Sequence, residues 1–290
     1  MNMQTTQSAQ TIQTTQTTLD EIAAQATSGD IVFSTHAEIA LGVQKRLEDP
    51  DCTMEQLGKL ISADPLLAAR TLSVANSVAF NPGGRAITDL KAAVSRLGFS
   101  ALRALTASVI VRQMAATPLS PEQKALSATL WEHTANVAAL ARVIAKHVTR
   151  QPPDTAFMAG IVHEIGNFYL ITQAGTHPGL LKSDLASWHE DGEARVGRAI
   201  LGALEIPPSI MDALETLWSG YLALPPTSLG DTLLLADEVS PVESPLATLM
   251  GMSREGMPAE IELLVDEETL SHILAESADE VSSLTNALKH

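Results

Sequence analysis

Apolar residues recur at spacings of three and four along most of this chain, and this periodicity limits the fold more than any other feature. Such spacing places apolar side chains on one face of an α-helix, whereas a half-buried strand alternates with a period of two. No segment shows sustained alternation with a period of two. The pattern therefore predicts an all-α protein with about twelve helices.

Start and stop signals divide the periodic stretches into separate helices. Thr53 and Ser120 each precede a Gln at the third helical position, which is the pattern of a capping box. Asp64 followed by Pro65 also favours a helix start, because the missing N–H of Pro would have no partner in the first turn. Gly98 predicts the end of one helix before another begins.

The core of such a protein must be built mainly from aliphatic side chains. Hydrophobic residues are 45% of the 290 residues, but aromatic residues are only 3%. The net charge of −16 argues against direct binding of nucleic acid or of an anionic membrane, because Lys and Arg make most such contacts. The single cysteine, Cys52, excludes an internal disulfide, and neither a signal peptide nor an apolar run of roughly 18 residues is present. We therefore expect a cytoplasmic protein.

One apolar stretch carries an imidazole and a carboxylate side by side. Residues 156–167 read AFMAGIVHEIGN, in which His163 and Glu164 interrupt the apolar run. The small residues of this stretch would let the helix that begins after Ser120 approach closely, and His133 lies on the apolar stripe of that helix. A lone buried His is more often a hydrogen-bonded core residue than a metal ligand, so a chemical site requires further ligands.

Asn76 and Ser77 lie near the end of the helix that begins at Pro65. A buried Asn or Ser must form hydrogen bonds, either with a ligand or with the local backbone. We name both residues as candidates for ligand binding, while capping of the local backbone is the reading that we favour.

The region around these two residues resembles a known family. The run D-P-x-L-x-A-R-x-L-x-x-A-N-S at 64–77 and the turn A-x-x-x-L-G at 93–98 resemble the HDOD domain, the HD-related output domain of bacterial signalling proteins. The resemblance covers residues 19–239, although the Leu-Pro-x-Leu-Pro entry of the family is not found at 31–35. It implies a multi-helix fold in which an N-terminal helical bundle packs on an HD-like C-terminal bundle.

The resemblance also suggests how the chain is divided. Residues 1–18 are rich in Gln and Thr and are expected to be disordered. Residues 19–240 would form the HDOD domain, with an N-terminal helical lobe at 19–118 and an HD-like lobe at 119–240. Residues 241–290 would be a C-terminal helical extension. We find no receiver, GGDEF-like or kinase segment, so we expect a stand-alone HDOD protein.

The second lobe resembles the HD superfamily of metal-dependent phosphohydrolases, which bind metal with a His, then a His-Asp pair, then a later Asp. The matching residues here are His133, His163 with Glu164 in place of Asp, and Asp237. The resemblance therefore implies a site for a single divalent metal ion (Mn, Fe or Zn). In the alternative, which we favour, no cofactor is bound and the four residues pair with one another as a buried polar cluster.

Relatives that bind two metals have further histidines in this lobe. The corresponding positions read Glu193 and Leu217-Trp218 here, and His147, His177 and His189 do not restore the pattern. We therefore expect no second metal ion.

The sequence leaves three functions open. We favour a non-catalytic regulatory module of signal transduction that acts by binding signalling proteins or a small ligand. The alternative is a single-metal phosphohydrolase, for example a nucleotide or cyclic-dinucleotide phosphodiesterase. A scaffold that binds a cyclic dinucleotide without cleaving it is the third hypothesis, but no Arg-rich binding motif supports it.

Overall fold

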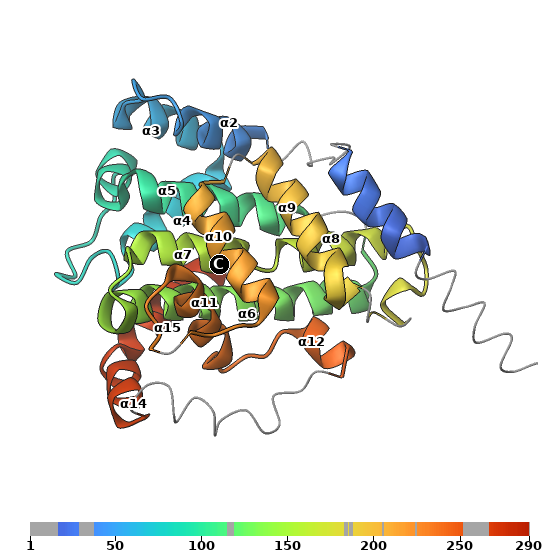
Figure 1. Ribbon diagram of the computed structural model, residues 1–290. Coiled ribbons are helices and arrows are strands. Elements are labelled where there is room, and N and C mark those ends of the chain that lie inside the picture. The colour runs from blue at the N-terminus through green and yellow to red at the C-terminus, as the bar shows by residue number, and fades with distance from the viewer. Residues whose placement is uncertain are drawn as a thin grey trace, which may run out of the picture.

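The computed structural model describes residues 17–28, 38–114, 119–182, 185, 188–204, 206–223, 225–251 and 267–289. Within this part of the chain the regular secondary structure is helical and contains no strand, as the sequence predicted (Figure 1). The Gln- and Thr-rich segment lies outside the described residues except at 17 and 18, and the stretch at 31–35 lies outside them as well.

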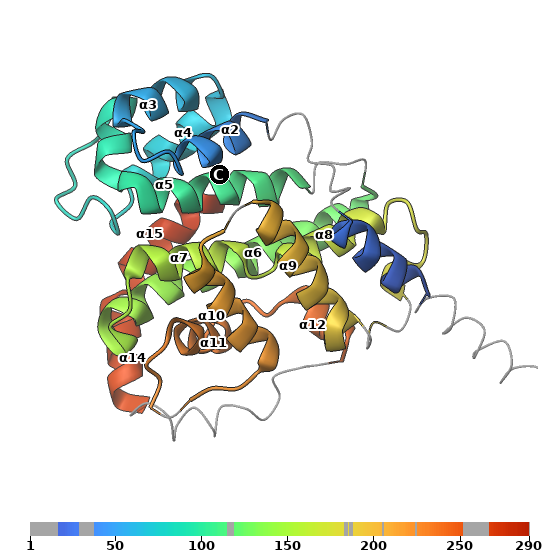
Figure 2. The same ribbon diagram turned by 45° about the horizontal axis from the view of Figure 1, so that its top comes forward.

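A group of helices from the first half of the chain packs around α5. These helices are α2 (Glu38–Arg46), α3 (Met54–Ser62), α4 (Pro65–Ala75) and α5 (Leu90–Met114), and Figure 2 shows α5 running beneath the other three. Gly98 interrupts α5 with φ +70° and ψ 179°, a conformation that glycine adopts at little cost. The helix break predicted at Gly98 is therefore present.

The second half of the chain begins with the long helix α6. The elements follow in this order: α6 (Pro121–Ile144), the π-helical η2 (Ala145–Thr149), α7 (Pro153–Val162), α8 (Ile165–Gln173), η3 (Leu180–Lys182), η4 (Trp188–Gly192), α9 (Glu193–Ala203), α10 (Pro208–Ser219), α11 (Leu229–Glu238), α12 (Pro245–Leu249), α14 (Glu267–Glu276) and α15 (Ala278–Lys289). The capping box predicted at Ser120 is formed: its Oγ accepts from the backbone N–H of Gln123, and Gln123 Oε1 accepts from Ser120 N–H.

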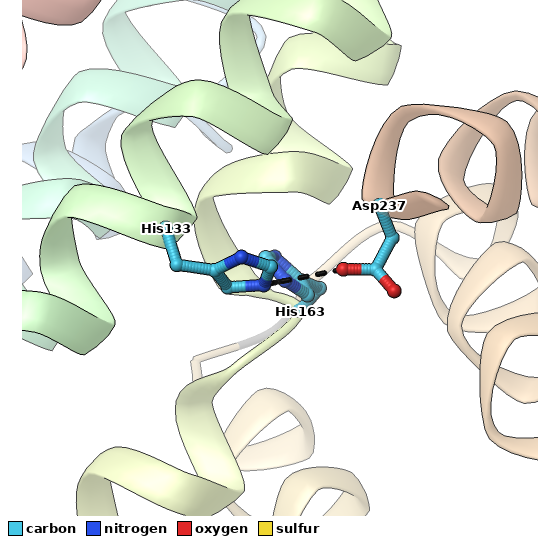
Figure 3. A group of neighbouring side chains, drawn as sticks. All are labelled: His133, His163 and Asp237. Carbon is cyan, nitrogen blue, oxygen red and sulfur yellow. Dashed lines mark hydrogen bonds and ion pairs between the residues drawn. The ribbon is translucent and has the colours of Figure 1, made fainter. Parts of the chain in front are cut away.

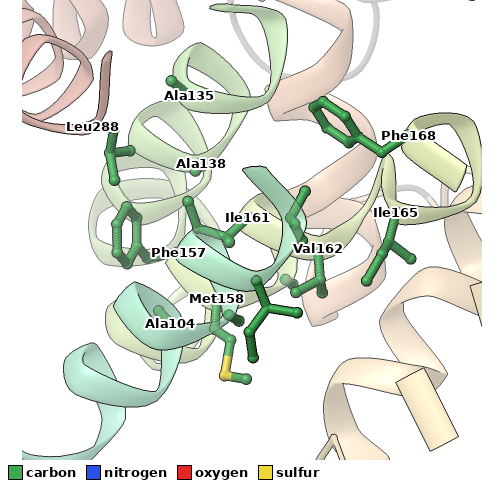
Figure 4. Packing of buried hydrophobic residues seen from close by; sticks show 14 of the residues in the cluster. Ala104, Ala135, Ala138, Phe157, Met158, Ile161, Val162, Ile165, Phe168 and Leu288 are labelled. Atoms are coloured by element: carbon green, nitrogen blue, oxygen red, sulfur yellow. The ribbon is translucent and has the colours of Figure 1, made fainter. Parts of the chain in front are cut away.

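The helix α7 lies in the middle of the fold. All its residues from Ala156 to Val162 are buried, and it packs against α6 on one side and α5 on another (Figure 4). A helix that is apolar on all sides is expected inside a core. Gly160 allows the closest approach, because a Cβ at this position would clash with the backbone of Ala138 in α6. This approach fixes the end of α7 relative to the middle of α6.

Two helices near the chain ends pack far from their neighbours in sequence. A helix over 17–27 lies near α9, where Asp20 Oδ1 is 3.6 Å from a guanidinium nitrogen of Arg195 (Figure 1). The sequence assigned this helix to the N-terminal lobe. At the other end, α15 packs on both α6 and α4 and so contacts both halves of the molecule (Figure 2). The domain boundaries themselves stay a prediction.

One described helix is long and apolar enough to cross a membrane by length and composition alone. It is the Leu90–Arg112 part of α5, of which 67% in the most apolar window is buried inside the fold. A buried core helix passes the same test, so this is weak evidence for a membrane span.

Candidate metal centre

Three helices bring two histidines and a carboxylate to one point. His133 lies in the middle of α6, His163 directly follows α7, and Asp237 lies in the last turn of α11 (Figure 3). One potential ligand atom of each residue lies within 4.8 Å of those of the other two. Both histidines are buried, while the Asp237 side chain is 31% exposed. The open side of the group is therefore at Asp237.

Glu164 joins this group from the turn between α7 and α8. Its Oε1 lies 3.4 Å from His133 Nε2 and 3.9 Å from His163 Nε2. His133 Nε2 also lies 3.2 Å from Asp237 Oδ1. The longer Glu side chain thus reaches both imidazoles. We call His133, His163, Glu164 and Asp237 the four-residue cluster.

Backbone carbonyls hold the outer nitrogen of each imidazole. His133 Nδ1 lies 2.7 Å from the Val242 oxygen, and His163 Nδ1 lies 2.8 Å from the Gly160 oxygen. A ring nitrogen facing a carbonyl must carry a proton, so Nε2 of each neutral ring has an unshared pair. These two Nε2 atoms face each other at 3.1 Å. Because two unshared pairs repel at this distance, a proton or a metal cation must separate them.

The surrounding charges place that proton on His133. Burial alone would lower the pKa of His133, but hydrogen bonds to Asp237 and Glu164 outweigh it and raise the pKa to about 10. Burial lowers the pKa of His163. Burial would raise the pKa of Glu164, but the His133 hydrogen bond and the charges of both histidines lower it to about 2. A cation that enters the cluster must therefore displace the proton of His133.

The donor set fits a single divalent metal ion. Two imidazoles and two carboxylates are ligands that Zn, Mn and Fe all accept. Metal-bound histidines usually donate their other ring N–H to a carbonyl or carboxylate, which is the arrangement that Val242 and Gly160 provide here.

Asn167, at the third position of α8, supports Glu164. Its side-chain Nδ2 donates to Glu164 Oε2 at 2.5 Å, and its Oδ1 accepts from the indole nitrogen of Trp188 at 2.8 Å. All three side chains are buried. The amide therefore connects the four-residue cluster to η4.

A cavity of about 330 Å³ opens beside the four-residue cluster, and its walls are acidic. It reaches His163, Glu164 and Asp237 of the cluster. The other lining residues are Asn167, His189, Glu190, Glu193, Ala194, Leu217, Trp218, Glu238, Glu243, Ser244, Ala247 and Met250. No Lys or Arg is found among these described lining residues, so the cavity favours cations over anions.

Glu193, the first residue of α9, is a site residue that the sequence patterns did not indicate. Burial and the charge of Glu164 raise the pKa of Glu193 to about 8. The sequence analysis considered this position only as a lost histidine. A carboxylate can bind metal just as an imidazole can. The Glu at this position was therefore the signal that could have placed residue 193 in the cavity.

Comparison with known families identifies the fold that holds this site. A model of the HDOD domain matches residues 34–215, which is more than half of the chain. The chain belongs to the HDOD family. No curated protein matches it.

Solved structures with this HDOD fold come from several bacteria. A protein from Shewanella amazonensis SB2B, provisionally named a metal-dependent phosphohydrolase, is 23% identical with a TM-score of 0.71, and the match covers 94% of this chain and 99% of that chain. An HDOD-domain protein of unknown function from Geobacter sulfurreducens is 21% identical with a TM-score of 0.59, covering 92% and 97%. A protein from Marinobacter aquaeolei VT8, provisionally named a signal transduction protein, is 18% identical with a TM-score of 0.55, covering 90% and 60%. At these identities the likeness concerns the fold alone.

The HDOD signature residues Asn76 and Ser77 lie in the first half of the chain, away from the four-residue cluster in sequence. The Asn76 amide donates to the carbonyls of Leu72 and Ile87 and accepts from Ile87 N–H. Ser77 Oγ donates to the Val74 carbonyl. These are contacts with nearby backbone, as we favoured from the sequence. A ligand-binding role for the two residues stays a prediction that no contact described here supports.

Proposed function

We propose that this HDOD chain is a non-catalytic regulatory module of bacterial cytoplasmic signal transduction, and that its four-residue cluster holds one divalent metal ion. The sequence left open whether the four residues bind a metal ion or only pair with one another. We propose that they bind a metal ion. The observation that carries it is the pair of His133 and His163 Nε2 atoms at 3.1 Å, each ring with its Nδ1 on a backbone carbonyl.

The cluster is suited to regulation because its ligands come from separate elements. His133 belongs to α6, His163 and Glu164 to the turn between α7 and α8, and Asp237 to α11. A bound divalent ion would supply positive charge that favours one packing of these elements over others. Occupancy of the cluster would then alter the surface that a signalling partner contacts.

The acidic cavity argues against a phosphohydrolase. Phosphoryl transfer requires positive groups that neutralise charge on the transferred phosphoryl oxygens. Here Glu190, Glu238 and Glu243 line the cavity in addition to the cluster, with no Lys or Arg among the described lining residues. A single divalent ion would be largely balanced by Glu164 and Asp237. The same charge disfavours a cyclic dinucleotide, which is a dianion.

The first experiment measures metal binding. Wild-type protein dialysed against Mn²⁺ should retain close to one ion per chain, and His163→Ala should weaken binding at least about tenfold because it removes a ligand. His189→Ala is the matched control, since His189 lines the same cavity but lies outside the four-residue cluster. A wild-type protein that retains neither Mn²⁺, Fe²⁺ nor Zn²⁺ contradicts the proposal.

The second experiment separates regulation from catalysis. Mn²⁺-loaded protein should not hydrolyse bis(p-nitrophenyl) phosphate, a general phosphodiester probe. Hydrolysis that disappears in His163→Ala and persists in His189→Ala would instead favour the phosphohydrolase.

A further inference from the structure

Trp188 determines which way the Asn167 amide points. An indole N–H can only donate a hydrogen bond, so the Asn167 atom 2.8 Å from it must be the carbonyl Oδ1. The amide nitrogen then has to face the other way, where it donates to Glu164 Oε2. Trp188 is fully buried and Asn167 is 3% exposed, so bulk water does not compete for either bond.

The held amide in turn fixes the orientation of the Glu164 carboxylate toward the histidines. Oε2 is engaged by Asn167, while Oε1 is the atom that lies 3.4 Å from His133 and 3.9 Å from His163. Rotation of the carboxylate would break a buried hydrogen bond to a charged group, which is among the stronger hydrogen bonds in proteins. The orientation of Glu164 is therefore set from outside the four-residue cluster.

Asn167 also lies between two carboxylates. Its amide opposes the rise that burial and Glu164 cause in the pKa of Glu193. Gly166 makes this arrangement sterically possible, because a Cβ there would lie 2.8 Å from the Glu193 carbonyl oxygen and 3.2 Å from its Cγ. The first turn of α9 can therefore approach α8 closely beside Asn167.

We propose that Asn167 is a positioning residue for metal binding and that the Trp188 N–H sets its orientation. Glu164 then presents one oxygen to the two imidazoles while the Asn167 amide, held by Trp188, engages the other. The inference rests on the proposed metal-binding role of the four-residue cluster. Trp188 lines neither the cluster nor the cavity, but through Asn167 it would affect the affinity for the metal ion.

Trp188→Phe tests this effect at a distance from the metal. The substitution keeps a buried aromatic ring but removes the N–H, so Asn167 Oδ1 loses its donor and the amide is no longer held in place against Glu164. Calorimetric titration with Mn²⁺ should show an affinity at least about tenfold weaker than that of wild type. Trp131→Phe is the matched control, because it removes an indole N–H that donates instead to the Leu288 carbonyl. Its Mn²⁺ affinity should equal that of wild type.

A double-mutant cycle tests whether Trp188 acts through Asn167. Asn167→Ala should weaken Mn²⁺ binding at least as much as Trp188→Phe, and the double variant should bind no more weakly than Asn167→Ala. Wild-type affinity in Trp188→Phe, or additive losses in the double variant, would overturn this inference while leaving the metal site intact. A wild-type protein that binds no Mn²⁺ would overturn the proposed function as well, so the two failures can be told apart.

Discussion

At the scale of single residues, the four-residue cluster is a buried group of charges in which one proton has several acceptors. His133 is fully buried, and the carboxylates of Glu164 and Asp237 lie within 3.4 Å and 3.2 Å of its Nε2. Removing such charges from water is costly unless each is paired. The protonated imidazole between two carboxylates provides that pairing in the absence of a metal ion.

The proton on His133 makes the stability of the metal-free protein depend on pH. The pKa of His133 is raised from 6.5 to about 10, so its protonation stabilises the fold below pH 6.5 and this contribution is lost as pH rises toward 10. Glu193, with a pKa raised to about 8, acts in the same direction. Chelator-treated protein should therefore lose about 2–3 kcal/mol of unfolding free energy between pH 6.5 and about pH 9 from His133 alone, and Glu193 should add to this loss. Urea unfolding at several pH values measures this loss.

His133→Gln is the control for that experiment. Because Gln does not titrate in this range, the variant should show a much smaller decline over the same interval. A wild-type stability that stays level or increases toward about pH 9 in the presence of chelator would exclude the proposed location of the proton.

At the scale of helices, the cluster depends on the contact between α6 and α7. Gly160 and Ala138 meet backbone to backbone, three residues before His163 and five residues after His133. The Gly160 carbonyl also accepts from His163 Nδ1. One close contact thus sets both the spacing of the two helices and the orientation of a histidine.

Gly160→Ala should therefore destabilise the fold and disturb the cluster together. The added methyl group would clash with the Ala138 Cα and lie 2.9 Å from its nitrogen, and backbone cannot move aside as a side chain can. We expect a loss of about 1–3 kcal/mol, as for other overpacked cores, with weaker Mn²⁺ binding. Gly58→Ala in α3 is the matched control, because no atom lies within 4 Å of its Cβ position and it should be neutral or slightly stabilising. Equal stabilities of the two variants would show that the α6–α7 contact can relax.

Local signals in the sequence were sufficient to predict helices but not which distant helices meet. The capping boxes at Thr53 and Ser120 and the break at Gly98 depend on a few adjacent residues, and all three are present. The convergence of His133 and His163 was implied only by the family resemblance. Glu193 was missed because its entry into the cavity depends on the packing of α9 against α8 at Gly166.

At the scale of the whole molecule, α15 connects the two halves of the chain. It packs on α4 and α6, and its Leu288 carbonyl accepts from the Trp131 indole of α6. The sequence predicted helices in this region, but an amphipathic face does not identify its partner. Arg142 of α6 pairs with Glu280 of α15, and its guanidinium lies 4.6 Å from the ring centroid of Phe80 in the first half of the chain.

Glu280→Gln tests how far this connection stabilises the molecule. Glu280 Oε1 lies 2.7 Å from Arg142 Nη1, and the two side chains are only 16% and 12% exposed. Because the substitution removes the nearer of the two carboxylates beside this poorly solvated guanidinium and leaves only Asp154 at 3.4 Å, we expect a loss of about 1–3 kcal/mol in urea unfolding. The unfolding transition should remain single, since α15 still packs on α4 and α6. Glu55→Gln, at the exposed ion pair with Lys59 in α3, is the control and should leave the midpoint unchanged. If the two variants unfold at the same urea concentration, the Arg142–Glu280 pair does not hold α15 in place.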